Sequence, residues 1–267
     1  MIQPLFAANA VVYAIQNATI EGKITVLALL VLSLFSWTII ITKFRQLQIA
    51  RKATKKFLAA YGSTRDPLDI QRKGEEFDGA PAYQLYIRGA DELAYQLKNN
   101  PVTVKGERRI STASFEAVKV ALEEAASGEA MGLEKGMIVL STAVAGGPFI
   151  GLLGTVWGVM STFAGIAESK AATLTAMAPG VAAALVATVT GLLVAIPAMF
   201  AYNFMVTTIR SITQELDGFA SRYANQIEHV YVDHRPLADE IRNANEVLAG
   251  RIVGALKSNE TTALVDR

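Results

Sequence analysis

Three long stretches of the chain carry no charged side chain. They cover residues 24–42, 136–167 and 171–209, which are 19, 32 and 39 residues long, and every Lys, Arg, Asp, Glu and His lies outside them. A hydrocarbon core of about 30 Å needs roughly 20 residues of helix, so stretches of this length are typical of membrane spans. The sequence therefore predicts an all-α integral membrane protein with three transmembrane helices.

Basic residues cluster directly after the first span. The cluster consists of Lys43, Arg45, Arg51, Lys52, Lys55 and Lys56, whereas only Glu21 and Lys23 precede the span. Lys and Arg accumulate in cytoplasmic segments next to spans. We therefore expect a multi-pass protein with a periplasmic N-terminus and a cytoplasmic C-terminus. Its segments are residues 1–23 (periplasmic, amphipathic, without the basic region of a secretory signal), 24–42 (span), 43–135 (cytoplasmic, helical), 136–167 (stalk end and span), 168–170 (periplasmic turn), 171–209 (span) and 210–267 (cytoplasmic, helical).

The second and third spans are longer than a bilayer requires. At 1.5 Å per residue they would reach about 48 Å and 58 Å. We expect both helices to extend into the cytoplasm as a bundle, with residues 107–135 forming a helical stalk that leads into the second span, and no strands. The third should continue as an amphipathic helix to a break near residues 234–236, followed by a helix over 238–256. Its apolar stripe is formed by Ile209, Ile212, Leu216, Phe219, Tyr223, Ile227 and Val230.

Small residues and prolines recur within the two long spans. The prolines Pro148, Pro179 and Pro197 are interpreted either as kinks in a packed bundle or as functional hinges. Small residues allow close helix approach in lipid, either within one subunit or against another subunit or a foreign helix. They form the rows Gly147–Gly151, Gly154–Gly158, Gly180–Ala184–Thr188 and Ala183–Ala187–Gly191–Ala195.

Hydroxyl groups supply nearly all the polar chemistry of these spans. A single Thr in a helix usually bonds its own i−4 carbonyl, which is the ordinary interpretation of Ser161, Thr162 and Thr190. Thr155 and Thr188 instead lie within the small-residue faces, so the two hydroxyls are expected to meet if those faces pack together. Such a pair can line a hydrated ion path, as oxygen ligands do in channels.

No span contains an Asp, Glu or His. Proton relays within membranes are normally built from these residues. Either the chain moves no protons, or the titrating acid is supplied by another polypeptide.

Two motifs resemble the ExbB/TolQ branch of the MotA/TolQ/ExbB proton-channel family. They are GLLGTVWG at residues 151–158 and APGVAAALVATVTGLLVAIP at residues 178–197, followed by Tyr202-Asn203. The match covers both long spans. A single span before the cytoplasmic segment is similar to ExbB and TolQ, because MotA-type stators carry two there.

The resemblance implies a homo-oligomer, pentameric in the best-known members, around the single transmembrane helices of an ExbD/TolR-like partner. That partner's membrane Asp carries the proton, and its periplasmic part passes force to an outer-membrane system through a TonB/TolA-like protein. Thr155 and Thr188 match the family's pore threonines, and Gly180 with the small residues after it would face the partner helix. This chain has Ala183 where the family usually has Glu, so both H⁺ and Na⁺ remain open as the coupling ion.

Other functional classes fit the sequence less well. A membrane scaffold would explain the small residues but not the hydroxyls on the packing faces. We expect no enzyme, cofactor or metal site, because the chain has no Cys, its His229 and His234 have no ligand-like partners, and Gly146-Gly147-Pro148 has no following Lys. The net charge of +1 argues against nucleic acid as a partner.

Overall fold

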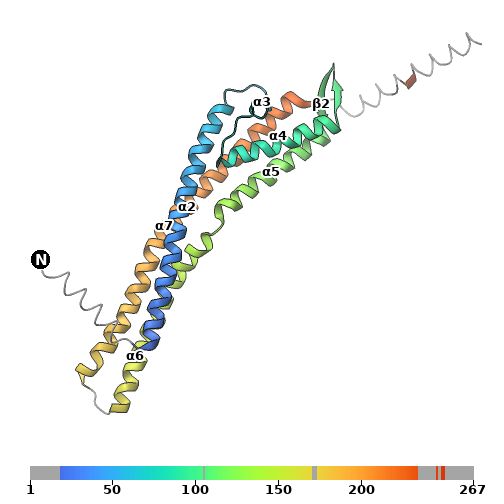
Figure 1. The fold of residues 1–267 in the computed structure, drawn as a ribbon. Helices are drawn as coiled ribbons and strands as arrows, with labels where there is room; N and C mark the ends of the chain where they lie inside the picture. The colour runs from blue at the N-terminus through green and yellow to red at the C-terminus, as the bar shows by residue number, and fades with distance from the viewer. Residues whose placement is uncertain (1–18, 105, 170–172, 234–244, 246–247, 250–267) are drawn as a thin grey trace, which may run out of the picture.

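Three long helices dominate the protein. A computed structural model describes residues 19–104, 106–169, 173–233, 245 and 248–249. The long helices are α2 (Ile20–Tyr61), α6 (Met137–Ser169) and α7 (Leu174–Tyr231), and each is long and apolar enough to cross a membrane. Figure 1 shows them side by side through the lower half of the molecule, with further helices beside α2 and α7 in the upper half. The predicted all-α membrane fold with three spans is confirmed.

The long helices α2 and α7 continue well beyond the uncharged stretches. The predicted apolar stripe on α7 is buried from Ile209 to Ile227, but Val230 is 39% exposed and does not belong to it. The helix ends at Tyr231, close to the predicted break. Residues 1–18 of the predicted segment 1–23, residue 170 of the predicted turn 168–170 and nearly all of the predicted helix 238–256 lie outside the described residues. Residues 20–23 form the first turn of α2.

The predicted stalk over residues 107–135 is wrong in two respects. Residues Glu107–Ser111 form strand β2 and not helix, and helix α5 (Thr112–Glu134) begins after it, where the Ser111 hydroxyl accepts a hydrogen bond from the Ser114 N–H. In addition, α5 does not run straight into α6. Gly136, with a φ of +87°, turns the chain between them, a backbone conformation that glycine adopts easily.

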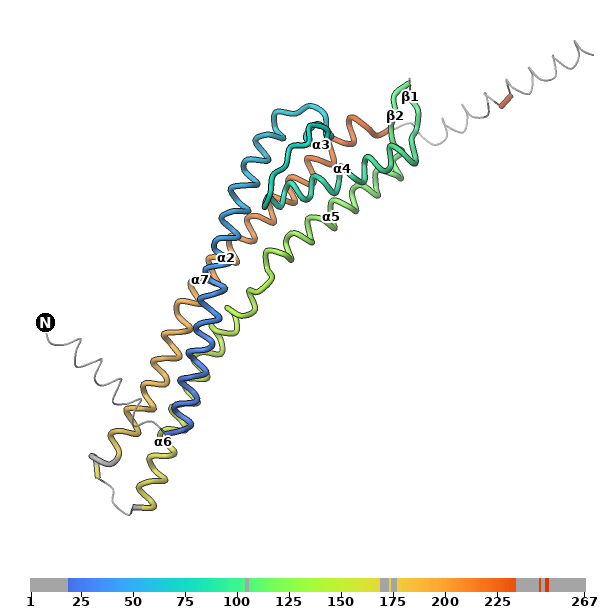
Figure 2. Tube along the Cα trace, in the orientation of Figure 1, coloured from blue at the N-terminus to red at the C-terminus, as the bar shows by residue number. Residues whose placement is uncertain are grey.

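The excess length of α6 therefore lies at the end remote from α5. Thr25, near the start of α2, is the nearest residue of that helix to Gly154 of α6. From there α6 runs on to Ser169, about 22 Å of helix, whereas α2 begins only about 8 Å before Thr25. The tube in Figure 2 shows the α6–α7 hairpin extending past the first turn of α2. Glu168, predicted to lie in a turn, belongs to the last turn of α6.

The upper half has its own aromatic core. Helices α3 (Asp69–Lys73) and α4 (Pro81–Asn99) complete it, together with α5. Phe57 and Tyr61 of α2 pack on Phe219 and Tyr223 of α7, with Phe57 and Phe219 centroids 5.4 Å apart and edge to face. Strand β1 (Val102–Val104) pairs antiparallel with β2, and β2 pairs in parallel with β3 (Val232–Asp233). These three short strands were not predicted.

A polar contact ties the end of α7 to the loop before α3. The Tyr231 hydroxyl donates to Asp66 Oδ1 at 2.8 Å, and the Arg72 guanidinium pairs with the same carboxylate. Burial raises the pKa of Tyr231 to about 12. Burial alone would raise the pKa of Asp66, but hydrogen bonds from the Leu68 N–H and the Tyr231 hydroxyl, with the Arg72 charge, lower it below its usual value.

Candidate functional site

Glycines of α6 bring its backbone against α7. A Cβ on Gly151 would lie 3.0 Å from the Ala187 carbonyl oxygen and from Thr188 Cα, and one on Gly158 would lie 2.7 Å from Ala184 Cβ. At Gly158 a Cβ would require α7 to shift, and at Gly151 it would make a contact tighter than most real Cβ contacts, so glycine favours this close approach. Gly147 meets Gly191 and Ala195 in the same way, and Gly154 meets both Ala187 and Thr25.

Both small-residue rows of α7 take part in this packing. Ala184 and Ala187 are buried against α6 of the same chain, with Ala187 only 1% exposed, and Gly180 lies against Thr162. Of the two alternatives left by the sequence, packing within one subunit therefore applies to these residues. Ala183 is half-buried where the start of α2 meets α6 and α7, and it lines a cavity of about 10 Å³ with Thr19, Gly22 and Gly154 among others.

The hydroxyls of Thr155 and Thr188 meet between α6 and α7. Thr188 Oγ1 lies 3.3 Å from Thr155 Oγ1 and 3.2 Å from the Gly151 carbonyl oxygen, and its single proton can be donated to either. Thr155 Oγ1 donates to the Leu152 carbonyl at 2.6 Å. Both side chains are half-buried. The prediction that these two hydroxyls lie together is confirmed.

Thr188 differs from the other threonines of the hairpin in its hydrogen bonding. Thr190 donates to the Val186 carbonyl and Thr162 to the Gly158 carbonyl, each at 2.8 Å and four residues back. This is the ordinary arrangement for a helical Thr. Thr188 instead directs its hydroxyl across to α6, and the absence of a side chain at Gly151 makes room for it.

The site is a neutral cluster of oxygen atoms. It comprises the two Thr hydroxyls and the carbonyl oxygens of Gly151 and Leu152. Such oxygens can solvate a cation or order water, but they do not bind a proton at ordinary pH. Within the described ranges, no group of His, Asp or Glu is placed to hold a metal ion.

The prolines of the hairpin lie inside continuous helices. Pro148 lies in α6, and Pro179 and Pro197 lie in α7, all three half-buried. None of them ends its helix.

Thr25 is a neighbour of the site that sequence reasoning missed. It is 5% exposed, its side chain lies next to Gly154, and its hydroxyl donates to the Glu21 carbonyl at 2.7 Å. The one available signal was spacing, because Thr25, Leu29, Ser36 and Lys43 follow the buried seam of α2. That seam brings a third helix to the Thr155–Thr188 level.

Comparison with known proteins places this hairpin in a defined family. The model of the MotA/TolQ/ExbB proton channel family matches residues 94–218, which include both threonines. The Tol-Pal system protein TolQ of Pseudomonas aeruginosa is 34% identical over 190 residues, covering 71% of this chain and 80% of that protein. The chain belongs to the MotA/TolQ/ExbB proton channel family.

Further relatives in this family carry two different names. TolQ of Haemophilus influenzae is 32% identical over 209 residues, covering 78% of this chain and 89% of that protein. The biopolymer transport protein ExbB of Xanthomonas campestris is 32% identical over 199 residues, covering 74% of this chain and 78% of that protein. The names of these relatives confirm the ExbB/TolQ branch of the family.

Proposed function

We propose that the chain is the ion-channel, stator-type subunit of a bacterial inner-membrane motor that converts the proton motive force into mechanical work. The contact between Thr155 and Thr188 carries this proposal. Two hydroxyls from different helices meet in a stretch with no ionisable side chain, at a level where α2, α6 and α7 all pack. The family assignment supports an ion-conducting role in preference to an enzymatic one.

The acid that this chain lacks is supplied by a partner. Proton transport through a membrane needs a group that binds and releases the proton, and the uncharged stretches contain none. The partner is an ExbD/TolR-like protein with one span and a membrane Asp. Several copies of this chain, five by analogy with the family, surround the partner helix, and the motor acts on an outer-membrane system directly or through a TonB/TolA-like protein.

The orientation follows from the basic residues. Lys43, Arg45 and the exposed Lys and Arg residues further along α2 lie on the side of the aromatic core, which is therefore the cytoplasmic side. The hairpin tip beyond the first turn of α2 is then periplasmic. Exposed apolar side chains on this tip, including Met160 and Phe163, are covered in the assembly by lipid or by neighbouring subunits.

Replacement of Thr188 by Val tests the proposal. Val keeps the shape of Thr and removes the hydroxyl, so the purified complex of this chain with its partner should lose at least about tenfold in ion flux, the effect of one lost charge-solvating group of roughly 1.4 kcal/mol or more. Thr188→Ser should keep most of the flux. The matched control is Thr190→Val, on the same helix, whose hydroxyl bonds its own backbone.

Assembly must be measured beside flux. Size-exclusion chromatography should give the same complex for Thr188→Val, Thr190→Val and the unmodified chain. An intact Thr188→Val complex with unchanged flux would contradict the ion-path role and favour the scaffold alternative. Repeating the measurement with Na⁺ replaced by K⁺ separates the sodium alternative, because a proton-coupled complex keeps its flux.

A further inference from the structure

Lys43 is a buried cation at the point where the chain leaves the membrane. It is the first charged residue after the uncharged stretch 24–42, yet it is only 7% exposed. Its ammonium donates to Gln46 Oε1 at 2.8 Å, to the Leu133 carbonyl at 3.0 Å and to the Gly132 carbonyl at 3.3 Å. Among the described residues, no carboxylate forms an ion pair with it.

The backbone acceptors of Lys43 lie at the end of another helix. Gly132 and Leu133 belong to the last turn of α5, where carbonyl groups have no partner further along the helix. The C-terminal end of a helix also carries partial negative charge, so a cation there is favourable. A buried ammonium must find such acceptors because leaving it unpaired is costly. Lys43 of α2 therefore caps α5 from outside that helix.

Three helices meet at this point. Gly136 lies two residues after the end of α5, and a Cβ on it would lie 3.7 Å from Ile39 Cδ1 and 3.9 Å from Lys43 Cε. Helix α6 then begins at Met137. The turn between the cytoplasmic helix α5 and the membrane helix α6 therefore lies against the aliphatic part of the Lys43 side chain.

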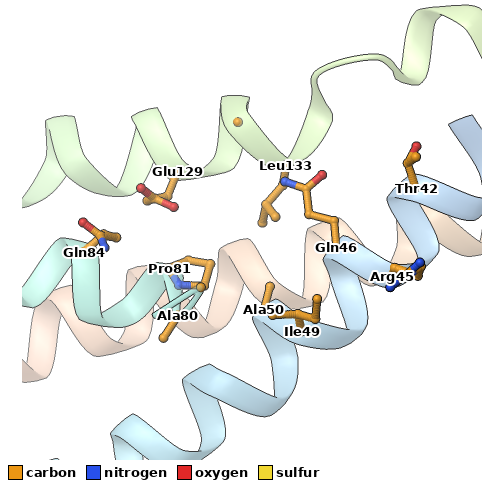
Figure 3. A pocket seen from close by; sticks show the side chains of 12 residues that line it. Thr42, Arg45, Gln46, Ile49, Ala50, Ala80, Pro81, Gln84, Glu129 and Leu133 are labelled. Carbon is orange, nitrogen blue, oxygen red and sulfur yellow. The ribbon is translucent and has the colours of Figure 1, made fainter. Parts of the chain in front are cut away.

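A pocket lies on the cytoplasmic side of this junction. Figure 3 shows a pocket between α2, α4 and α5, with Gln46 of α2 extending toward Leu133 of α5. The pocket has a volume of about 530 Å³, and Gln46, Gly132 and Leu133 all line it. A pocket separates part of α2 from α5 here, and the hydrogen bonds of Lys43 cross between the two helices and connect them directly.

We propose that Lys43 is a positioning residue that clamps the cytoplasmic arm, defined as α4 and α5, to the membrane helix α2. The clamp fixes where α6 enters the membrane, and Thr155 lies about 27 Å further along the same helix. It therefore holds the arm and the membrane hairpin as one body. The geometric part stands on the contacts alone, whereas its consequence for ion-coupled work rests on the function proposed above.

Spin-label distance measurements test the clamp directly. The chain has no native Cys, so labels can be attached at Gln48→Cys on α2 and Ser127→Cys on α5, both exposed positions. With Lys43 unchanged, the distance between the two labels should have one narrow distribution in the full-length protein in lipid. Lys43→Met keeps the stem without the donors and should lose the narrow peak. Lys43→Arg keeps charge and donors and should retain it.

The control and the contradicting result are equally specific. Lys52→Met, an exposed Lys on the same helix, should leave the distribution unchanged. A Lys43→Met distribution that superimposes on that of Lys52→Met would overturn the clamp. If Lys43→Met does not accumulate in membranes, Lys43→Gln takes its place with the same expected loss and the same contradicting result. These outcomes do not depend on ion flux, so failure of the clamp and failure of the proposed function are distinguishable.

Discussion

At the scale of single residues, the position of the Thr188 hydroxyl depends on Gly151, which has no side chain. Its hydroxyl reaches the Gly151 carbonyl and Thr155 because α6 approaches α7 closely at Gly151. A neighbouring glycine, Gly146, has open space at its Cβ position. The close approach of α7 therefore favours a glycine at position 151, whereas the surroundings of Gly146 leave room for a side chain.

Replacing Gly151 by Ala should separate the two helices locally. The new methyl would lie 3.0 Å from the Ala187 carbonyl oxygen and Thr188 Cα, and both are parts of a backbone that must shift. We expect a loss of roughly 1–3 kcal/mol in stability, as for overpacked cores, and reduced ion flux with the partner. Thermal unfolding in detergent and liposome flux measure these effects. Gly146→Ala is the control, and equal behaviour of the two variants would contradict the account.

The sequence was informative about these threonines and silent about Lys43 and Thr25. Thr155 and Thr188 stood out because each lies within a small-residue face of an uncharged span. Lys43 looked like one member of a basic cluster, and its burial depends on the end of α5, which lies about ninety residues further along the chain. The spacing of residues within a short segment does not indicate such a long-range contact.

At the scale of elements, long apolar periodicity predicted helices well and short pairings poorly. The stripe on α7 from Ile209 to Ile227 follows helical spacing and is buried as expected. In contrast, β2 pairs with β3 across more than 120 residues of chain. Its sequence, Glu107–Ser111, is charged and resembles the start of the following helix, so the strand depends on a partner that local pattern cannot reveal.

Two glycine-to-alanine replacements, one at the junction between α5 and α6 and one inside α5, should change the stability of the protein in opposite directions. Gly136 has a φ of +87°, so Gly136→Ala should destabilise the protein by about 1 kcal/mol. Gly128 lies inside α5 with open space at its Cβ position, so Gly128→Ala should stabilise it by about 0.5–1 kcal/mol. Thermal unfolding of the two variants in the same detergent measures both changes. Two shifts in the same direction would contradict a left-handed turn at the junction.

At the scale of the whole molecule, one chain combines the α6–α7 hairpin, helix α2 and the arm formed by α4 and α5. The aromatic core joins α2 to α7, the glycine rows join α6 to α7, and Lys43 joins α2 to α5. Spans and family could be predicted from the uncharged stretches and the two motifs. The helical character of residues 43–135 was also predicted, but the arrangement of the arm was not, because its helices are joined by turns, short strands and polar contacts that carry little periodic signal.

The central claim is that this assembly conducts ions only with a carboxylate supplied by another polypeptide. Proton uptake into liposomes under an imposed membrane potential tests it most directly, with this chain alone, with the single-span partner, and with the partner's membrane Asp replaced by Asn. The account predicts proton flux only in the preparation that contains this chain together with the unmodified partner. Coupled proton flux through liposomes that contain only this chain would contradict it.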